Sequence, residues 1–167
     1  MKTDRELIDF EKKLTCQFRV ISGIKTALYF SPNFSSKKQS EWPILLFVHG
    51  INGSHFGLVP LAKYHLERHN IRFILVDLPG HGASSTPSWH DIPNLQEWFT
   101  GLIENLTNHA EVPSKIIAHS FGCYAITSTK IRLLYISPVP EITKLYGRLT
   151  KLLIKPFRSR VFPKFYD

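Results

Sequence analysis

One serine lies at the point where an apolar strand would meet a helix. Residues 114–119 read as a strand, residues 123–130 suit a helix, and Ser120 lies at the turn between them. A strand that turns on a serine directly into a helix is typical of a nucleophile elbow, which exposes the hydroxyl near a base. The crowded turn needs small residues two positions before and after the serine, and Ala118 and Gly122 stand there. The alternative is a buried strand followed by a serine that caps a helix.

Two more apolar runs each end in a loop that contains glycine. Residues 44–48 are all apolar and lead into His49 and Gly50, and residues 73–77 lead into the loop 78–85. Continuous apolar runs of this length are typical of strands buried on both faces of a parallel sheet. Alternation of such strands with helical patterns predicts an α/β fold, a mostly parallel sheet with helices on both faces. Sites in such sheets lie at the carboxyl ends of the strands.

Three motifs follow one another along the chain. The first is the His-Gly pair at 49–50, the second covers 77–84, and the third is centred on Ser120. The second motif has the pattern D-x-P-G-H-G-x-S, with these residues in place: Asp77, Pro79, Gly80, His81, Gly82 and Ser84. On these motifs the chain resembles the α/β-hydrolase fold family, of the esterase, lipase and C–C hydrolase type, over roughly residues 17–140.

The resemblance implies a serine hydrolase that acts on an ester, thioester or similar acyl bond and needs no cofactor or metal. Ser120 would be the nucleophile, and the backbone N–H groups of Ile51 and Phe121 would form the oxyanion hole. Asp77 would fix the loop after its strand and would not be the catalytic acid. The remaining motif residues would have structural roles: His49, Gly50, Gly80, His81, Gly82 and Gly122.

The residues that follow Ser120 do not complete a catalytic triad. In this family the acid and the histidine follow the serine in that order. Residues 121–167 contain no histidine, and their acids are Glu141 and Asp167. We therefore expect only the N-terminal part of the fold, without its last strands, and slight or absent hydrolysis by this chain alone.

Three explanations stay open for the incomplete site. The first is a fragment or a decayed copy of a hydrolase. The second is a working enzyme whose base is His49, His81 or His119, which lie at or beside strand ends. The third is a non-enzymatic binding or interaction module, or half of a two-chain assembly. An unpaired sheet edge after the strand at 131–137 would favour a partner chain that completes the sheet.

Composition and residue spacing do not favour a nucleic-acid-binding or a metal-binding protein. A chain of 167 residues with 43% hydrophobic and 20% charged residues suits one globular domain. The net charge is +8, but no recognition motif supports a nucleic-acid partner. His65 and His69 have helical spacing and lack a third metal ligand nearby. Two cysteines far apart and no signal-peptide pattern predict a reduced, cytoplasmic setting.

The last part of the chain is strongly basic. We expect a partial hydrolase core at 1–140, whereas 141–167 carries seven basic residues against two acidic ones. Its apolar stripe consists of Leu145, Leu149, Leu152 and Leu153. In the family this segment begins a helical lid over the site. The alternative is a basic amphipathic tail that makes peripheral contact with a membrane.

The other predicted elements follow from periodicity and turn residues. They are a short N-terminal helix at 2–14, two antiparallel strands at 17–22 and 26–31, an exposed loop at 32–41, a helix from Ser54 or Pro60 to His69, and a helix at 94–108 capped by Asn94. Cys123 should be buried inside the helix that follows Ser120.

Overall fold

A computed structural model describes residues 2–126 and 130–136 of the chain. The segment predicted as a lid or basic tail, 141–167, lies outside the described residues. Within the described part, every helix is too short or too polar to cross a membrane.

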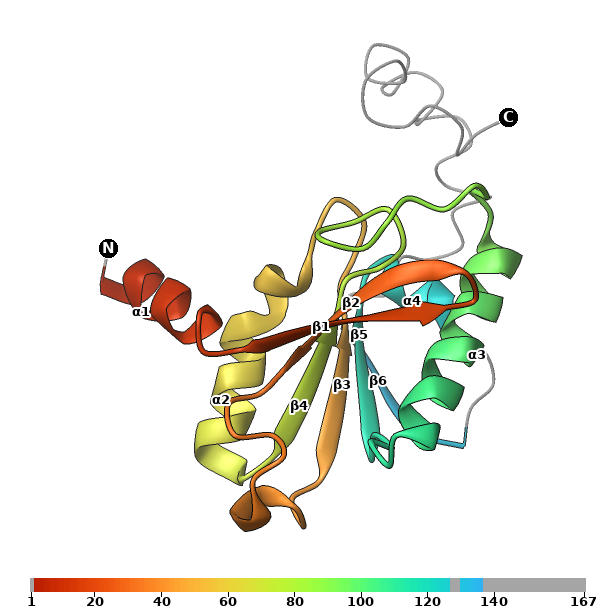
Figure 1. Cartoon of the computed structure of the whole chain (residues 1–167). Coiled ribbons are helices and arrows are strands. Elements are labelled where there is room, and N and C mark those ends of the chain that lie inside the picture. The colour runs from red at the N-terminus through yellow and green to blue at the C-terminus, as the bar shows by residue number, and fades with distance from the viewer. Residues whose placement is uncertain (1, 127–129, 137–167) are drawn as a thin grey trace.

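Six strands form one twisted sheet in the order β1-β2-β4-β3-β5-β6 (Figure 1). The pairs β3/β4, β3/β5 and β5/β6 are parallel, whereas β1/β2 and β2/β4 are antiparallel. The strands span Thr15–Ile21 (β1), Ile24–Phe30 (β2), Ile44–Val48 (β3), Arg72–Val76 (β4), Lys115–His119 (β5) and Arg132–Ile136 (β6). The mostly parallel α/β sheet is therefore confirmed.

Helices cover both faces of this sheet. Helix α3 (Ile92–Asn108) packs on one face, and α2 (Val59–His69) with α1 (Lys2–Glu11) lies on the other (Figure 1). Because side chains alternate along a strand, β3 sends Leu46 and Val48 to the α3 face and Leu45 and Phe47 to the α2 face. Both sets are buried, which explains why this strand is apolar at every position.

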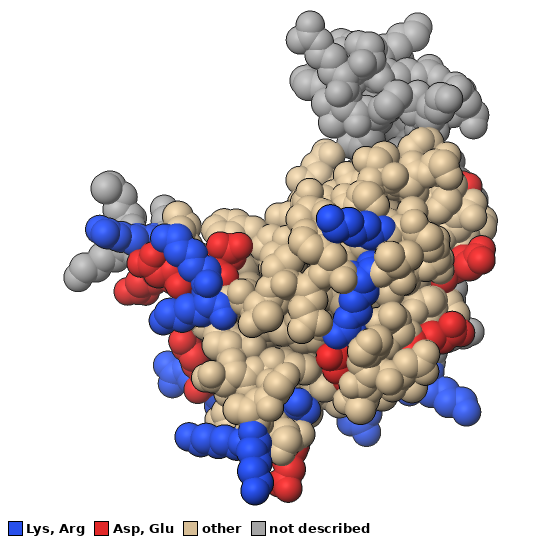
Figure 2. Space-filling view, in the orientation of Figure 1, with Lys and Arg blue, Asp and Glu red and all other residues tan. Residues whose placement is uncertain are grey.

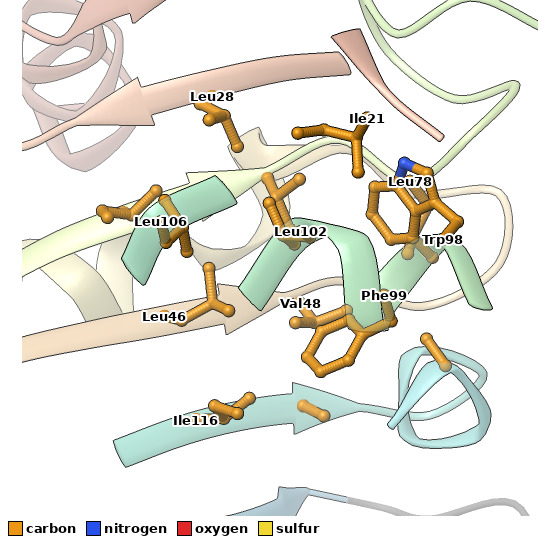
Figure 3. Packing of buried hydrophobic residues seen from close by; sticks show 14 of the residues in the cluster. Ile21, Leu28, Leu46, Val48, Leu78, Trp98, Phe99, Leu102, Leu106 and Ile116 are labelled. Atoms are coloured by element: carbon orange, nitrogen blue, oxygen red, sulfur yellow. The ribbon is translucent and has the colours of Figure 1, made fainter. Parts of the chain in front are cut away.

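The larger core cluster lies under α3. Figure 3 shows Trp98, Phe99 and Leu102 of α3 packed over side chains of the central strands, among them Leu46 and Val48. The indole N–H of Trp98 donates to the hydroxyl of Thr26 at 3.1 Å, so its polar atom is satisfied. The aromatic residues of this helix therefore belong to the core, as their helical spacing predicts.

Three local predictions are wrong in whole or in part. Helix α3 begins at Ile92, and its N-cap is Asp91 rather than Asn94; the Asp91 carboxylate accepts the N–H of Asn94 at 2.9 Å. The loop at 32–41 is largely exposed as predicted, except at Phe34, which is buried because its ring packs on Phe30 with centroids 4.9 Å apart and lies under Arg72. Cys123 is only half-buried.

Two predicted helices are shorter in the structure than their sequence patterns suggest. A 3-10 turn, η2 (His55–Leu58), precedes α2, whose start near Pro60 is confirmed. Helix α4 covers Gly122–Ala125, and Ile126 is already extended. The residues from 126 to 129 are β-branched or serine, which lowers helix propensity and explains the early end. A second 3-10 turn, η1, spans Lys37–Gln39.

Candidate active site

Ser120 occupies a strained turn at the carboxyl end of β5. Its φ is +50°, in the left-handed region that costs a non-glycine residue about 1–2 kcal/mol. The turn is held on both sides. The Ser120 N–H donates to the carbonyl oxygen of Ile136 at 3.0 Å, and the Ser120 carbonyl accepts the N–H of Cys123 at 3.0 Å. A serine in this backbone conformation between a strand and α4 is the geometry that the spacing predicts for a nucleophile elbow.

Small residues let the loop after β3 pack directly on this turn. A Cβ at Gly122 would overlap the carbonyl oxygen of His49. A Cβ at Gly50 would lie 3.0 Å from the Cβ of Ser120 and 3.0 Å from Nδ1 of His119. The fold therefore brings the His-Gly loop and the serine turn together, and both glycines are needed for that approach. Ile51, which follows Gly50, is partly buried against the core under α3.

His49 connects two loops at this edge of the sheet. Its Nε2 accepts the N–H of Leu78 at 3.0 Å, so the ring proton lies on Nδ1, which donates to the carbonyl oxygen of Gly50 at 2.7 Å. Burial of the ring lowers the pKa of His49 to about 4. Both ring nitrogens are thus engaged and the imidazole is neutral, which leaves His49 without a free lone pair to act as a base.

Asp77 is fully buried and accepts hydrogen bonds from several elements. The backbone N–H groups of His55 and Ala83 donate at 2.7 and 2.9 Å, and the hydroxyl of Tyr29 donates at 3.2 Å. A Cβ at Gly82, which has φ of +52°, would overlap the carboxylate. Burial raises the pKa of Asp77, but the hydrogen bonds from His55 and Ala83 outweigh it and hold that pKa below its usual range.

Ser84 extends the same network to β2. Its hydroxyl donates to the carbonyl oxygen of Asp77 at 2.7 Å and accepts the N–H of Ala27 at 2.9 Å. The Gly80 N–H, in a residue with φ of +75°, donates to the carbonyl oxygen of Ser85 at 3.0 Å. The carboxylate of Asp77 and the hydroxyl of Ser84 are therefore both engaged in hydrogen bonds that hold this loop against β2 and η2.

His81 has a different environment from His49. Its Nδ1 lies 3.0 Å from the carbonyl oxygen of Pro79, which can only accept, so the ring proton lies on Nδ1. Nε2 of the neutral ring keeps its lone pair, and no hydrogen bond engages that atom within residues 2–126 and 130–136. The ring centroid is 5.3 Å from that of His49. His81 is thus protonated on Nδ1 like His49, but its Nε2 lone pair accepts no hydrogen bond from the described residues, as a general base requires.

The amino-acid sequence does not predict the partners of Asp77. Tyr29 comes from β2 and His55 from η2, and their rings stack with centroids 3.5 Å apart and an interplanar angle of 16°. Glu11 of α1 reaches the far side of the same histidine. No local pattern connects these residues, because the contacts join distant strands and helices. In the described part of the chain, no three acidic, histidine or cysteine side chains gather as metal ligands would.

A serine in a left-handed turn at the carboxyl edge of this sheet defines a hydrolase scaffold. The model of the alpha/beta hydrolase family matches residues 45–166, which is most of the chain. The chain therefore belongs to the alpha/beta hydrolase family, as its motifs predict. No curated protein gives a significant match.

Several solved structures are similar to the chain. Epoxide hydrolase VrEH1 from Vigna radiata has 18% identity and a TM-score of 0.57, over 86% of this chain and 47% of its own. A membrane phospholipase A described as a bacterial virulence factor has 19% identity and a TM-score of 0.56, over 74% and 37%. The Cif epoxide hydrolase from Acinetobacter nosocomialis has 17% identity and a TM-score of 0.55, over 74% and 39%. The chain thus spans less than half the length of each, and the likeness concerns the fold.

Proposed function

We propose that Ser120 is the nucleophile of a serine hydrolase site that acts on an ester, thioester or similar acyl bond. The observation that carries this proposal is the positive φ of Ser120 at the carboxyl end of β5. Strain of this kind persists only where the surrounding structure imposes it, and it is concentrated at functional sites. Here two backbone hydrogen bonds hold the turn, from the Ser120 N–H to Ile136 and from the Cys123 N–H to Ser120. A serine that only capped a helix would need no such turn.

The backbone N–H groups of Phe121 and Ile51 are the proposed oxyanion donors. Phe121 directly follows the serine at the start of the turn into α4. Ile51 directly follows Gly50, where an added Cβ would lie 3.0 Å from the Cβ of Ser120. Two such donors would stabilise the negative charge that develops on the acyl oxygen when Ser120 attacks. The serine proton would pass to a base and then to the leaving alcohol or thiol, and water would later hydrolyse the acyl-serine.

The base and the acid are proposed to come from polypeptide outside the described residues. His49 has both ring nitrogens engaged, and the Asp77 carboxylate is used by the loops around it. We therefore infer slight or absent turnover by this chain alone. If the chain does turn over esters, His81 is the base we would test first, because its Nε2, unlike that of His49, accepts no hydrogen bond from the described residues.

A fluorophosphonate probe tests the nucleophile, because it labels an activated serine rather than an exposed one. We expect weak labelling of the folded chain that is lost in Ser120→Ala and retained in Ser54→Ala, a serine that caps η2. No labelling of the folded chain would mean that Ser120 is only a remnant of a nucleophile in this chain. Ester turnover in the normal range that Ser120→Ala abolishes would contradict the incomplete triad, and its loss in His81→Asn would identify the base.

A second candidate function is that the chain forms one half of a two-chain assembly. Strand β6 pairs with β5, and within the described residues nothing pairs with its other edge. Leu134 and Tyr135 are consecutive residues of β6, so their side chains point to opposite faces of the sheet, and they are 48% and 43% exposed. A parallel strand with apolar residues exposed on both faces favours pairing with another chain that completes the sheet.

Sedimentation of the chain over a range of concentrations tests this second function. We expect concentration-dependent association, or binding of a separately supplied C-terminal hydrolase segment, that Leu134→Glu weakens. Val112→Glu is the matched control, because Val112 is 50% exposed and lies in the loop before β5. Equal effects of the two variants would exclude the β6 edge as the interface.

The segment 141–167 is proposed as the start of the lid, with membrane contact as the alternative. Its excess of basic residues would bind anionic vesicles if the segment lay on a membrane. Removal of 141–167 should then abolish binding to vesicles that contain phosphatidylserine. A cytoplasmic location remains part of the proposal, and detection of the chain in a secreted fraction would contradict it.

A further inference from the structure

His55 lies between two carboxylates from distant parts of the chain. Its Nδ1 is 3.1 Å from Oδ1 of Asp77, at the end of β4, and its Nε2 is 3.4 Å from Oε1 of Glu11, at the end of α1. The ring of Tyr29 stacks on the imidazole. The His55 side chain is only 11% exposed, and that of Glu11 is 32% exposed. Both ring contacts are therefore shielded in part from water.

The protonation of the ring decides how many of these contacts are hydrogen bonds. A carboxylate can only accept, so both contacts are hydrogen bonds only when both ring nitrogens carry a proton. A neutral ring has one proton and makes one such bond. The contact with Asp77 is the shorter one and is supported by the backbone N–H of His55, which donates to the same oxygen at 2.7 Å. The neutral ring therefore keeps its proton on Nδ1 and loses the bond to Glu11.

Helix α1 has one apolar anchor beside this ionisable one. Phe10 is buried and packs on Phe73, with ring centroids 6.4 Å apart. Leu7 and Leu14 are partly buried against the same cluster. In Figure 1, α1 projects from the side of the fold, with its C-terminal end nearest the sheet. The docking of α1 thus depends on the residues near its C-terminal end, where Phe10 and Glu11 are adjacent.

The other charged and titratable groups around His55 keep their state near neutral pH. Burial, and then the charge of Asp77, raise the pKa of Tyr29, so it remains a neutral phenol that donates to Asp77. Desolvation raises the pKa of the Cys16 thiol of β1, and burial lowers that of His49, so both are uncharged. Lys63 of α2 lies over the ring of Phe10 and pairs with Glu67 at 3.1 Å.

We propose that α1 is a pH-responsive latch, held on the sheet by the hydrogen bond between His55 and Glu11 when the imidazole carries two protons and loosened when the ring is neutral. Docking and protonation favour each other, because the docked helix adds a second carboxylate to the proton-binding site. The latch therefore closes as the pH falls. The test therefore covers the range from about pH 5 to 8, in which histidine side chains in general change charge.

Amide hydrogen exchange of α1, corrected for the intrinsic rate at each pH, tests the latch on the full chain. We expect the protection of the α1 amides to fall by about fivefold between about pH 5.5 and pH 8, the loss of one partly exposed charge-assisted hydrogen bond. Protection of α3 amides, which report the core, should change much less. A constant protection of α1 over this range would overturn the proposal, as would an absence of protection at every pH.

Two variants separate the ionisable anchor from the apolar one. In Glu11→Gln the side-chain amide can donate to the neutral Nε2 and accept from the protonated one, so the pH dependence should disappear while the helix stays docked. In Phe10→Ala the protection should fall at every pH while its pH dependence remains. A pH dependence that persists in Glu11→Gln would assign the effect to another group and overturn the latch.

Discussion

Gly122 lies so close to the carbonyl oxygen of His49 that no side chain fits between them. This contact joins the turn after β5 to the loop after β3, and so it positions Ser120 beside Gly50. A glycine two residues after the serine is thus required by packing between two loops, and not by its own backbone angles.

Replacement of that glycine should destabilise the whole fold. Because the methyl group of Gly122→Ala would overlap backbone atoms, the free energy of unfolding should fall by about 1–3 kcal/mol. Gly57→Ala is the control, since a Cβ at Gly57 meets nothing within 4 Å and should change stability by less than about 0.5 kcal/mol. Urea unfolding followed by tryptophan fluorescence measures both. Equal stabilities of the two variants would show that the loops move apart without cost.

The strain at Ser120 should be measurable as lost stability. Glycine adopts a positive φ readily, so Ser120→Gly should relieve the turn, whereas Ser120→Ala keeps the strain of a Cβ. After the entropy of the more flexible unfolded chain is subtracted, Ser120→Gly should be more stable than Ser120→Ala by about 0.5–1 kcal/mol. Thermal unfolding of the two variants provides the comparison. A less stable glycine variant would mean that the turn is not strained.

The buried His49 should make stability depend on pH. Its pKa in the folded chain is about 4, below the ordinary value of 6.5, so the unfolded state binds a proton more readily between these values. The contribution of His49 to the free energy of unfolding is complete above about pH 6.5. This contribution falls by up to about 3 kcal/mol as the pH decreases toward 4.

The variant His49→Gln isolates this contribution. It should be less stable than the natural chain near neutral pH, and the difference between the two should shrink as the pH falls from 6.5 to 4. Denaturant unfolding at a series of pH values measures the slope. A difference that stays constant with pH would place a charged, solvated imidazole at position 49.

The cap of α3 can be assigned by substitution. Because the Asp91 carboxylate accepts the Asn94 N–H, Asp91→Ala should lower the melting temperature, whereas Asp91→Ser keeps an acceptor and should retain most of the stability. The hydrogen bonds from Asn94 also lower the pKa of Asp91, so its benefit should be lost as the pH falls below the ordinary range of an aspartate. Identical melting temperatures of the alanine and serine variants would remove Asp91 as the cap.

The buried strand β3 could be predicted from the sequence, because burial on both faces requires apolar residues at consecutive positions. Five consecutive apolar residues from Ile44 to Val48 can be buried on both faces only in a covered, parallel sheet. The cap of α3 was misplaced because Asp91 and Asn94 are both favourable caps three residues apart. Pro93, near the first turn, suits a start at Ile92, and that signal identifies Asp91.

The amino-acid sequence by itself determined the order of strands and helices, the turn at Ser120 and the membership of the chain in its family, because periodicity and glycine spacing are properties of neighbouring residues. Only the tertiary structure decided which polar atoms meet at the edge of the sheet. Asp77 binds Tyr29 and His55, and His55 reaches Glu11, through contacts between elements far apart in the chain. A buried carboxylate must find donors wherever the packing of the sheet supplies them, and no local pattern records which residues those will be.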